Sequence, residues 1–239
     1  MLVVVCGMPR SGSTLQSNIV KRLLELNGVG ERVEWSRDWQ KEPANIEAYI
    51  RDERIYALKT HWLEDDMLAL ANLYPDRVFL ITSHRDPRDV AVSMMVKFDY
   101  SFNKAVKRIG EAIENINRVS SSSARHLHQK YQLLRYDLPA SVNQMAKFLE
   151  LPSEYNEKIV AELNIDEAYT KSRKKKVFME GVRRKWAFLM NRPVKFADDE
   201  MMLHPNHVSE HKGEEGVWRE KLTKDQADKI MSLFSDWIK

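Results

Sequence analysis

The residues best suited to bind a charged ligand lie in one short loop near the start of the chain. Gly7–Thr14 reads Gly-Met-Pro-Arg-Ser-Gly-Ser-Thr and stands between a short apolar run and a segment with helical spacing. A loop of this kind turns backbone N–H groups inward, and the N-terminus of the following helix adds a positive dipole. The sequence therefore predicts an anion site, whose candidate binding residues are Arg10, Ser11, Gly12, Ser13 and Thr14.

The same loop nearly matches the nucleotide-binding pattern G-x-x-x-x-G-K-[ST]. Ser13 stands where that pattern requires lysine, and Arg10 supplies a positive charge three places upstream. The loop on its own is thus compatible with a phosphate ligand, but its charge is not where an ordinary nucleotide-triphosphate loop places it.

Strands that alternate with helices must position this loop. Short apolar runs predict strands, and apolar spacing or capping residues predict the helices between them. Such alternation indicates crossover connections and a parallel sheet, with ligands beyond the carboxyl ends of the strands. The expected strands are Leu2–Cys6, Ile55–Leu58, Val78–Ile81 and Tyr131–Leu134. The expected helices are 14–26, 65–73, one from Asp86-Pro87 through Met94, 101–119 and 140–149.

The predicted fold class is therefore α/β, with a three-layer parallel β-sheet flanked by helices, similar to P-loop NTPases. One domain is expected to span 1–239, because 239 residues with 43% hydrophobic content suit a single sizeable core. The part from about 152 to 239 is basic and helical in pattern, and we expect it to form a C-terminal helical cap.

Composition excludes several classes of protein. A net charge of +3 is too small to indicate nucleic-acid binding, and a single cysteine, Cys6, forms neither a disulfide framework nor a cysteine-rich metal site. No apolar stretch approaches the ~18 residues of a membrane span. The opening apolar run is short and lacks the basic flank of a signal peptide, so a cytoplasmic location is expected.

Five short motifs follow one another along most of the chain. They are Arg10-Ser-Gly-Ser-Thr14, Lys59-Thr-His61, Arg85-Asp-Pro-Arg-Asp-Val-Ala-Val-Ser93, Tyr136-Asp137-Leu138 and His211-Lys-Gly-Glu-Glu-Gly-Val-Trp218. In this order they resemble the signatures of the cytosolic-type sulfotransferase family, whose donor is 3′-phosphoadenosine 5′-phosphosulfate (PAPS). The chain departs from that family at His211, where arginine is usual, and at Leu15, where an aromatic residue is common.

The resemblance implies two anion sites, because PAPS carries a 5′-phosphosulfate and a 3′-phosphate. The first loop would hold the 5′ end. The resemblance assigns Arg85 and Ser93 to the 3′-phosphate, and Ser93 lies two helical turns after Asp86 on the same face, which is compatible with that role. Each assignment has a structural alternative. Ser93 could be a helix-surface serine and Arg85 could pair with an acid. The segment near Lys212 could be an exposed turn, and Tyr136 could pack at a strand end. The further residues that the resemblance assigns to the donor are Tyr136, His211, Lys212 and Gly213.

His61 is the candidate general base. Sulfuryl transfer to an alcohol requires a group that takes the acceptor's proton, and imidazole titrates near neutral pH. Lys59 and Arg10 are expected to stabilise charge on the bridging oxygen of the leaving phosphate. A structural ion pair is the alternative for Lys59. The product would be 3′,5′-adenosine bisphosphate (PAP), and the acceptor, a small molecule or glycan, cannot be read from the sequence.

No metal is expected. His204 and His207, with His211, have ligand-like spacing, and His126 and His128 form a second pair. Pro205 argues against one helix that presents the first group, and structural zinc sites usually include cysteine. The aromatic residues of an acceptor pocket could include Trp186, Phe188 and Phe196, for which helix packing is the alternative.

Two other functions remain open. A P-loop kinase or nucleotidase shares the first loop, but the loop lysine is missing and Val78–Ile81 does not end in a magnesium-binding aspartate. A non-enzymatic anion or nucleic-acid binding module would use the basic runs 171–176 and 183–185, although no nucleic-acid motif accompanies them.

Overall fold

The computed structural model describes residues 1–33, 43–163 and 213–238. Its strands are β1 Leu2–Val5, β2 Gly30–Arg32, β3 Ile55–Lys59, β4 Val78–His84 and β5 Arg125–Lys130. The helices of the first half are α1 Ser13–Leu26, α2 Pro43–Arg51, α3 Asp65–Leu73, α4 Pro87–Phe98 and α5 Phe102–Ser120. Those that follow are α6 Tyr131–Tyr136, α7 Leu138–Phe148, α8 Asn156–Leu163, α10 Trp218–Lys221 and α11 Lys224–Phe234, with a 3-10 turn η3 at Ser235–Trp237.

The strands form one parallel sheet in the order β2-β3-β1-β4-β5. β1 lies in the middle, where Val5 is in register with Lys59 of β3 and with Ile81 of β4. All four residues of β1 are buried, since a central parallel strand is covered on both faces. The parallel α/β fold expected from the sequence is confirmed.

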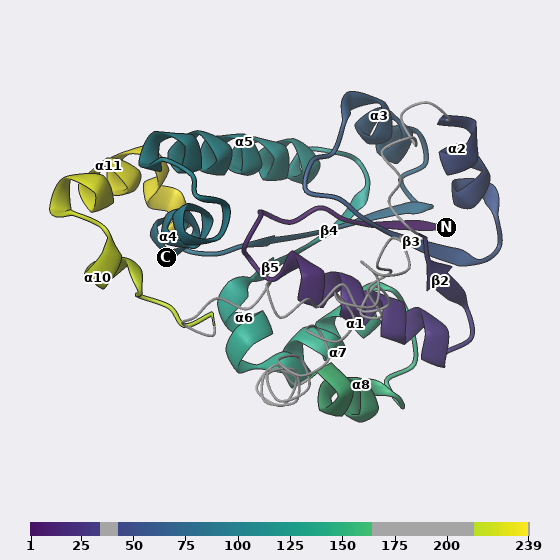
Figure 1. Cartoon of the computed structure of the whole chain (residues 1–239). Helices are drawn as coiled ribbons and strands as arrows, with labels where there is room; N and C mark the ends of the chain where they lie inside the picture. The colour runs from purple at the N-terminus through teal and green to yellow at the C-terminus, as the bar shows by residue number, and fades with distance from the viewer. Residues whose placement is uncertain (34–42, 164–212, 239) are drawn as a thin grey trace, which may run out of the picture.

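Helices cover both faces of the sheet, which gives three layers (Figure 1). Val3 and Val5 pack with α1, α7 and α8 on one face. Leu2 and Val4 point the opposite way and pack with α2 and α3. α4, α5 and α11 form a further apolar cluster that contains Met8 of the first loop. The loop after β1 is thereby enclosed between the two helical layers.

The last strand lies elsewhere than expected. Tyr131–Leu134 belongs to helix α6, and the strand that pairs with β4 is Arg125–Lys130. Tyr131 and Leu134 are buried at helical spacing, so the apolar residues that suggested a strand form one face of a short helix. β5 itself is polar because it lies at the end of the sheet order, where its histidines bind a side chain of β4.

Three further differences concern strand and helix limits. β4 continues past Ile81 to His84, so that Ser83 and His84 lie in the sheet. The short strand β2 and helix α2 were not expected. Gly30 begins β2, where a Cβ would overlap the Ile55 carbonyl oxygen at 1.9 Å.

The expected helical cap lies largely outside the described residues, which resume at Gly213. α8 belongs to the layer of α1 and α7, whereas α11 packs through Ile230 against the cluster of α4 and α5. None of the helices in the described ranges has the length and apolar character of a membrane span.

Candidate functional site

The loop between β1 and α1 has the backbone of an anion-binding turn. Arg10 (φ 67°) and Gly12 (φ 89°) adopt left-handed conformations on either side of Ser11. Such alternation turns successive N–H groups toward one side of a loop. Ser13 begins α1 directly after Gly12, and the first N–H groups of a helix have no intrahelical acceptor. This backbone geometry is the kind that presents N–H donors to an anion.

Hydrogen bonds to β4 hold this loop in place. The Met8 amide donates to the Ser83 carbonyl at 2.9 Å. Ser11 is fully buried, and its hydroxyl lies 2.6 Å from the Met8 carbonyl oxygen and 2.8 Å from Ser83 Oγ. The Ser11 side chain thus stabilises the loop, and its amide also donates within the loop, to the Met8 carbonyl at 3.3 Å. Gly7 is required here, since a Cβ would lie 2.4 Å from Ser83 Oγ.

Lys59 is the last residue of β3, and His61 follows the strand and contacts the loop. His61 Nδ1 lies 3.1 Å from the Gly7 carbonyl oxygen. A carbonyl only accepts, so Nδ1 carries the proton and Nε2 is the nitrogen with the lone pair in the neutral ring. Burial, with a smaller effect of the Arg32 charge, lowers the pKa of Lys59 to about 8. The end of β3 therefore holds an imidazole that contacts the loop and a cation with a lowered pKa.

Arg10 connects the loop to α4. Its Nε donates to Ser93 Oγ at 2.9 Å, so the first and second predicted anion sites meet at one hydrogen bond. Burial and then the charge of Arg85 lower the pKa of Arg10, which indicates that two cations share this region. Lys97 lies one turn beyond Ser93, and partial desolvation followed by the Arg10 charge lowers its pKa. Lys97 was not among the predicted residues, although its i,i+4 spacing from Ser93 was the available signal.

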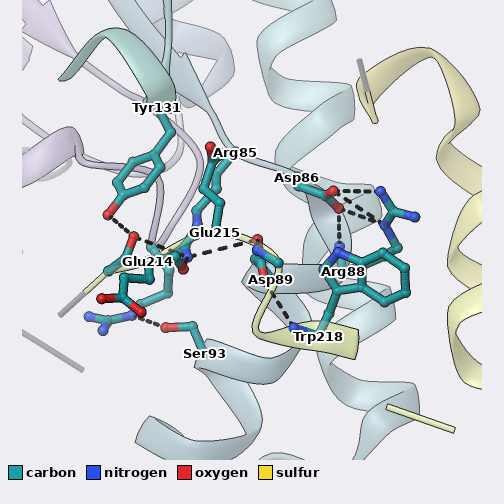
Figure 2. A network of polar contacts seen from close by, with 12 residues as sticks. Arg85, Asp86, Arg88, Asp89, Ser93, Tyr131, Glu214, Glu215 and Trp218 are labelled. Carbon is teal, nitrogen blue, oxygen red and sulfur yellow. Dashed lines mark hydrogen bonds and ion pairs between the residues drawn. The ribbon is translucent and has the colours of Figure 1, made fainter. Parts of the chain in front are cut away.

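Arg85, a predicted residue of the second anion site, lies within a network of polar contacts (Figure 2). It is 5% exposed, and its guanidinium lies over the Tyr131 ring at 4.4 Å. Its Nη2 donates to the carbonyl of Glu214, and Tyr131 Oη donates to the Gly213 carbonyl at 2.8 Å. Arg85 Nε is buried and has no hydrogen-bond partner among the described residues. A buried unpaired donor costs about 1–3 kcal/mol, so this nitrogen is a position where an oxyanion would fit.

Tyr136, the tyrosine that the resemblance assigned to the donor, does not take part in the network around Arg85. Tyr136 ends α6, is 58% exposed and lies under the Arg135 guanidinium at 5.5 Å. The tyrosine that contacts Arg85 is Tyr131, which sequence reasoning assigned to a strand. Among the C-terminal candidates, Gly213 is described and has φ 76°. The other two, His211 and Lys212, lie outside the described residues.

Three histidines form a separate polar chain between β4 and β5. Thr82 Oγ1 lies 2.7 Å from both His126 Nε2 and His128 Nδ1, and His128 Nε2 lies 2.6 Å from His84 Nδ1. Burial lowers the pKa of His84 and of His126 to about 4. Neutral rings suit this chain, because each contact needs one donor and one acceptor.

No group of three potential metal ligands occurs within residues 1–33, 43–163 and 213–238. His204 and His207, like Trp186, Phe188, Phe196 and the two basic runs, lie outside these ranges.

Comparison with known proteins adds a family to this geometry. The family model described as "Sulfotransferase domain" matches residues 2–239. No curated protein matches the chain in sequence. A solved mouse sulfotransferase complexed with PAP is similar at 16% identity and TM-score 0.66, over 100% of this chain and 83% of that chain. Retinol dehydratase in complex with androsterone and inactive cofactor PAP is similar at 17% identity and TM-score 0.59, over 100% of this chain and 80% of that chain.

Proposed function

Because the chain belongs to the sulfotransferase domain family, we propose that it transfers a sulfuryl group from PAPS to a hydroxyl or amine acceptor. The observation that carries this proposal is the meeting of two cationic sites at Ser93. Arg10 of the loop donates to Ser93, and Arg85 lies close enough to lower the pKa of Arg10. A ligand with an anionic group at each end would match both sites, as PAPS does and ATP does not.

The unpaired Nε of Arg85 gives independent support for the second site. A 3′-phosphate oxygen there would satisfy a buried donor. The two similar solved structures are described as complexes with PAP, the desulfated donor. We assign the 5′ end of the donor to the Arg10–Thr14 loop and the 3′ end to Arg85 and Ser93. Lys212 and Gly213 remain assigned to the 3′-phosphate by resemblance. His211 is assigned to the donor on the same ground, because it stands in the place of the family arginine.

We propose in-line transfer with His61 as the general base. The acceptor oxygen forms a bond to sulfur as the bond between sulfur and the bridging phosphate oxygen breaks, and the acceptor's proton moves to His61 Nε2. The Nδ1 contact with Gly7 supports this tautomer and holds the ring at the loop. Lys59 and Arg10 stabilise the negative charge that develops on the leaving oxygen.

The acceptor is proposed as a small molecule or a glycan. Retinol dehydratase, whose structure contains androsterone, is an example of a similar fold with a small apolar alcohol. For the compartment we propose the cytoplasm, since the single cysteine, Cys6, is buried and unpaired, as suits a reducing environment.

Titration calorimetry tests the donor. PAP should bind the wild-type chain much more tightly than ATP, and Arg85→Ala should lose most of the PAP affinity, by about 10²-fold if a buried charge-assisted contact is removed. Arg118→Ala is the matched control, because its partner is Asp65 on the surface. Equal weak binding of PAP and ATP would sink the sulfotransferase assignment. Magnesium-dependent ATP turnover without PAP binding would favour a P-loop kinase instead.

A further inference from the structure

Asp89 is a buried carboxylate in the first turn of α4, one helical turn after Arg85 (Figure 2). It is 2% exposed. Its Oδ2 accepts from the Gly216 amide at 2.8 Å, and its Oδ1 accepts from the Trp218 amide at 3.1 Å. Both oxygens of one side chain therefore hold the backbone of a segment that is about 130 residues away in sequence.

The surroundings of Asp89 compensate the cost of burying its charge. Arg85 Nη2 lies 3.9 Å from Asp89 Oδ2, and both side chains are nearly inaccessible. The position in the first turn of α4 adds the favourable end of the helix dipole. A buried carboxylate with two amide donors and a nearby cation is a stable arrangement, so its geometry is well defined.

Other contacts hold the same segment on both sides of Asp89. Trp218 lies 3.9 Å from the Arg88 guanidinium, which is itself paired with Asp86. At the other end, the Gly213 carbonyl accepts from Tyr131 Oη at 2.8 Å. Asp89 lies between these two anchors and binds the main chain directly.

We propose that Asp89 is a positioning residue for the 3′-phosphate end of the donor. By fixing the backbone of 213–218 against α4, it holds that segment and Arg85 as one wall of the second anion site. This inference rests on the proposed function, because the wall is useful only if a donor with a second anionic group binds there. Asp89 acts through Arg85 and the segment, not by contact with the donor.

A counter-ion role for Asp89 makes the opposite prediction. If its main effect were to neutralise Arg85, removal of the charge would leave Arg85 freer to attract an anion. Asp89→Asn would then bind PAP more tightly. A positioning role predicts weaker binding, because an amide group cannot accept both N–H bonds.

Calorimetry with PAP and with adenosine 5′-phosphate, which lacks the 3′-phosphate, separates these roles. Asp89→Asn should weaken PAP binding by about tenfold or more, the loss of charge-assisted hydrogen bonds. Its affinity for adenosine 5′-phosphate should stay within about twofold, because the Arg10–Thr14 loop holds the 5′ end. Tighter or unchanged PAP binding would overturn the proposal, and so would an equal loss for both ligands.

Asp89→Glu is the second variant, and it keeps the charge beside Arg85 but moves the carboxylate away from the two amides. We expect it to lose PAP affinity as well, whereas a counter-ion role predicts no loss. Asp137→Asn is the matched control, since it removes the charge of a carboxylate that accepts from a backbone amide, at the Ala140 cap of α7, and leaves 213–218 untouched. Failure of the wild-type chain to bind PAP would instead refute the proposed function itself.

Discussion

The two proposed anion sites are built in different ways. The first is a continuous loop, Gly7–Thr14, bonded through the Met8 amide to the neighbouring strand. The second is assembled from α4, the start of α6 and the segment after Gly213. Its hydrogen bonds join Tyr131 to Gly213, which are 82 residues apart in sequence, and Asp89 to Gly216, which are 127 residues apart. One site is part of the sheet, and the other is a set of side chains that draw distant segments together.

Because of this difference, substitutions at the first site should mainly change the stability of the domain, and substitutions at the second should mainly change donor binding. The backbone of the first loop continues the central ladder, since the Met8 amide donates to the Ser83 carbonyl of β4 at 2.9 Å. Disturbing it should disturb the core. The second site depends on a few side-chain bonds to the segment 213–218, and such regions open locally at lower free energy than a central strand. Substitutions there should reduce donor binding before they reduce the stability of the domain.

His61→Ala should give the largest effect on turnover. Loss of a general base typically lowers kcat by about 10²–10⁴-fold. Because His61 contacts the first loop and not Arg85, the affinity for PAP should change little. Steady-state kinetics and calorimetry on the same protein measure the two quantities. Near-normal kcat in a folded variant would show that the base lies elsewhere.

Two alanine substitutions at glycines compare the sites directly. At Gly7 a Cβ would lie 2.8 Å from the Ser83 amide nitrogen, which is strand backbone and cannot yield. At Gly213 a Cβ would lie 2.2 Å from Tyr131 Oη, and the residue has φ 76°. Gly7→Ala should therefore lower Tm by about 8 °C or more, the effect of roughly 2–3 kcal/mol of overpacking.

Gly213→Ala should instead leave Tm within about 3 °C and weaken PAP binding about tenfold, through strain in the segment. Thermal unfolding and calorimetry give both numbers for both variants. Equal losses of Tm would mean that the second site is as much part of the fold as the first, which would break the comparison.

The same difference explains what the sequence could reveal. The first loop, the strand before it and the cap at Asp86 depend on neighbours in the chain, so their residues suffice to predict them. The parallel sheet followed from the alternation of strands with helices. Contacts such as Asp89 with Gly216 leave no local pattern, because an acidic residue in a first helical turn is ordinary.

The error at β5 has the same origin. Arg125–Lys130 carries mostly polar residues, and Thr82 of β4 binds His126 and His128 across the strand pair. Tyr131 and Leu134 are the apolar residues that suggested a strand, but they form one face of helix α6. The sequence did predict Arg85 and Ser93, but only through their spacing in a recognised motif.

Lys59→Arg should change the pH dependence of kcat/KM, which tests the role of the lysine charge in the first site. Lys59 has a pKa of about 8, so its charge is present below that pH and lost above it. If the charge stabilises the leaving group, kcat/KM should fall as pH rises through about 8. Arginine keeps its charge, so the alkaline limb should move upward by about one unit or more, limited by other groups. An unmoved limb would assign it to another residue.

Ser93→Ala should give the smallest effect, because Ser93 adds one neutral hydroxyl to the second site, whereas Arg85 adds a charge. Its hydroxyl accepts from Arg10 Nε, and loss of one such bond is worth about 1 kcal/mol, or roughly fivefold in PAP affinity. Ser101→Ala is the matched control: it removes the N-cap of α5, so it should lower Tm and leave PAP affinity unchanged. A loss at Ser93 as large as that of Arg85→Ala would mean that the hydroxyl, and not the guanidinium, dominates the second site, and the two sites would then have to be regarded as one.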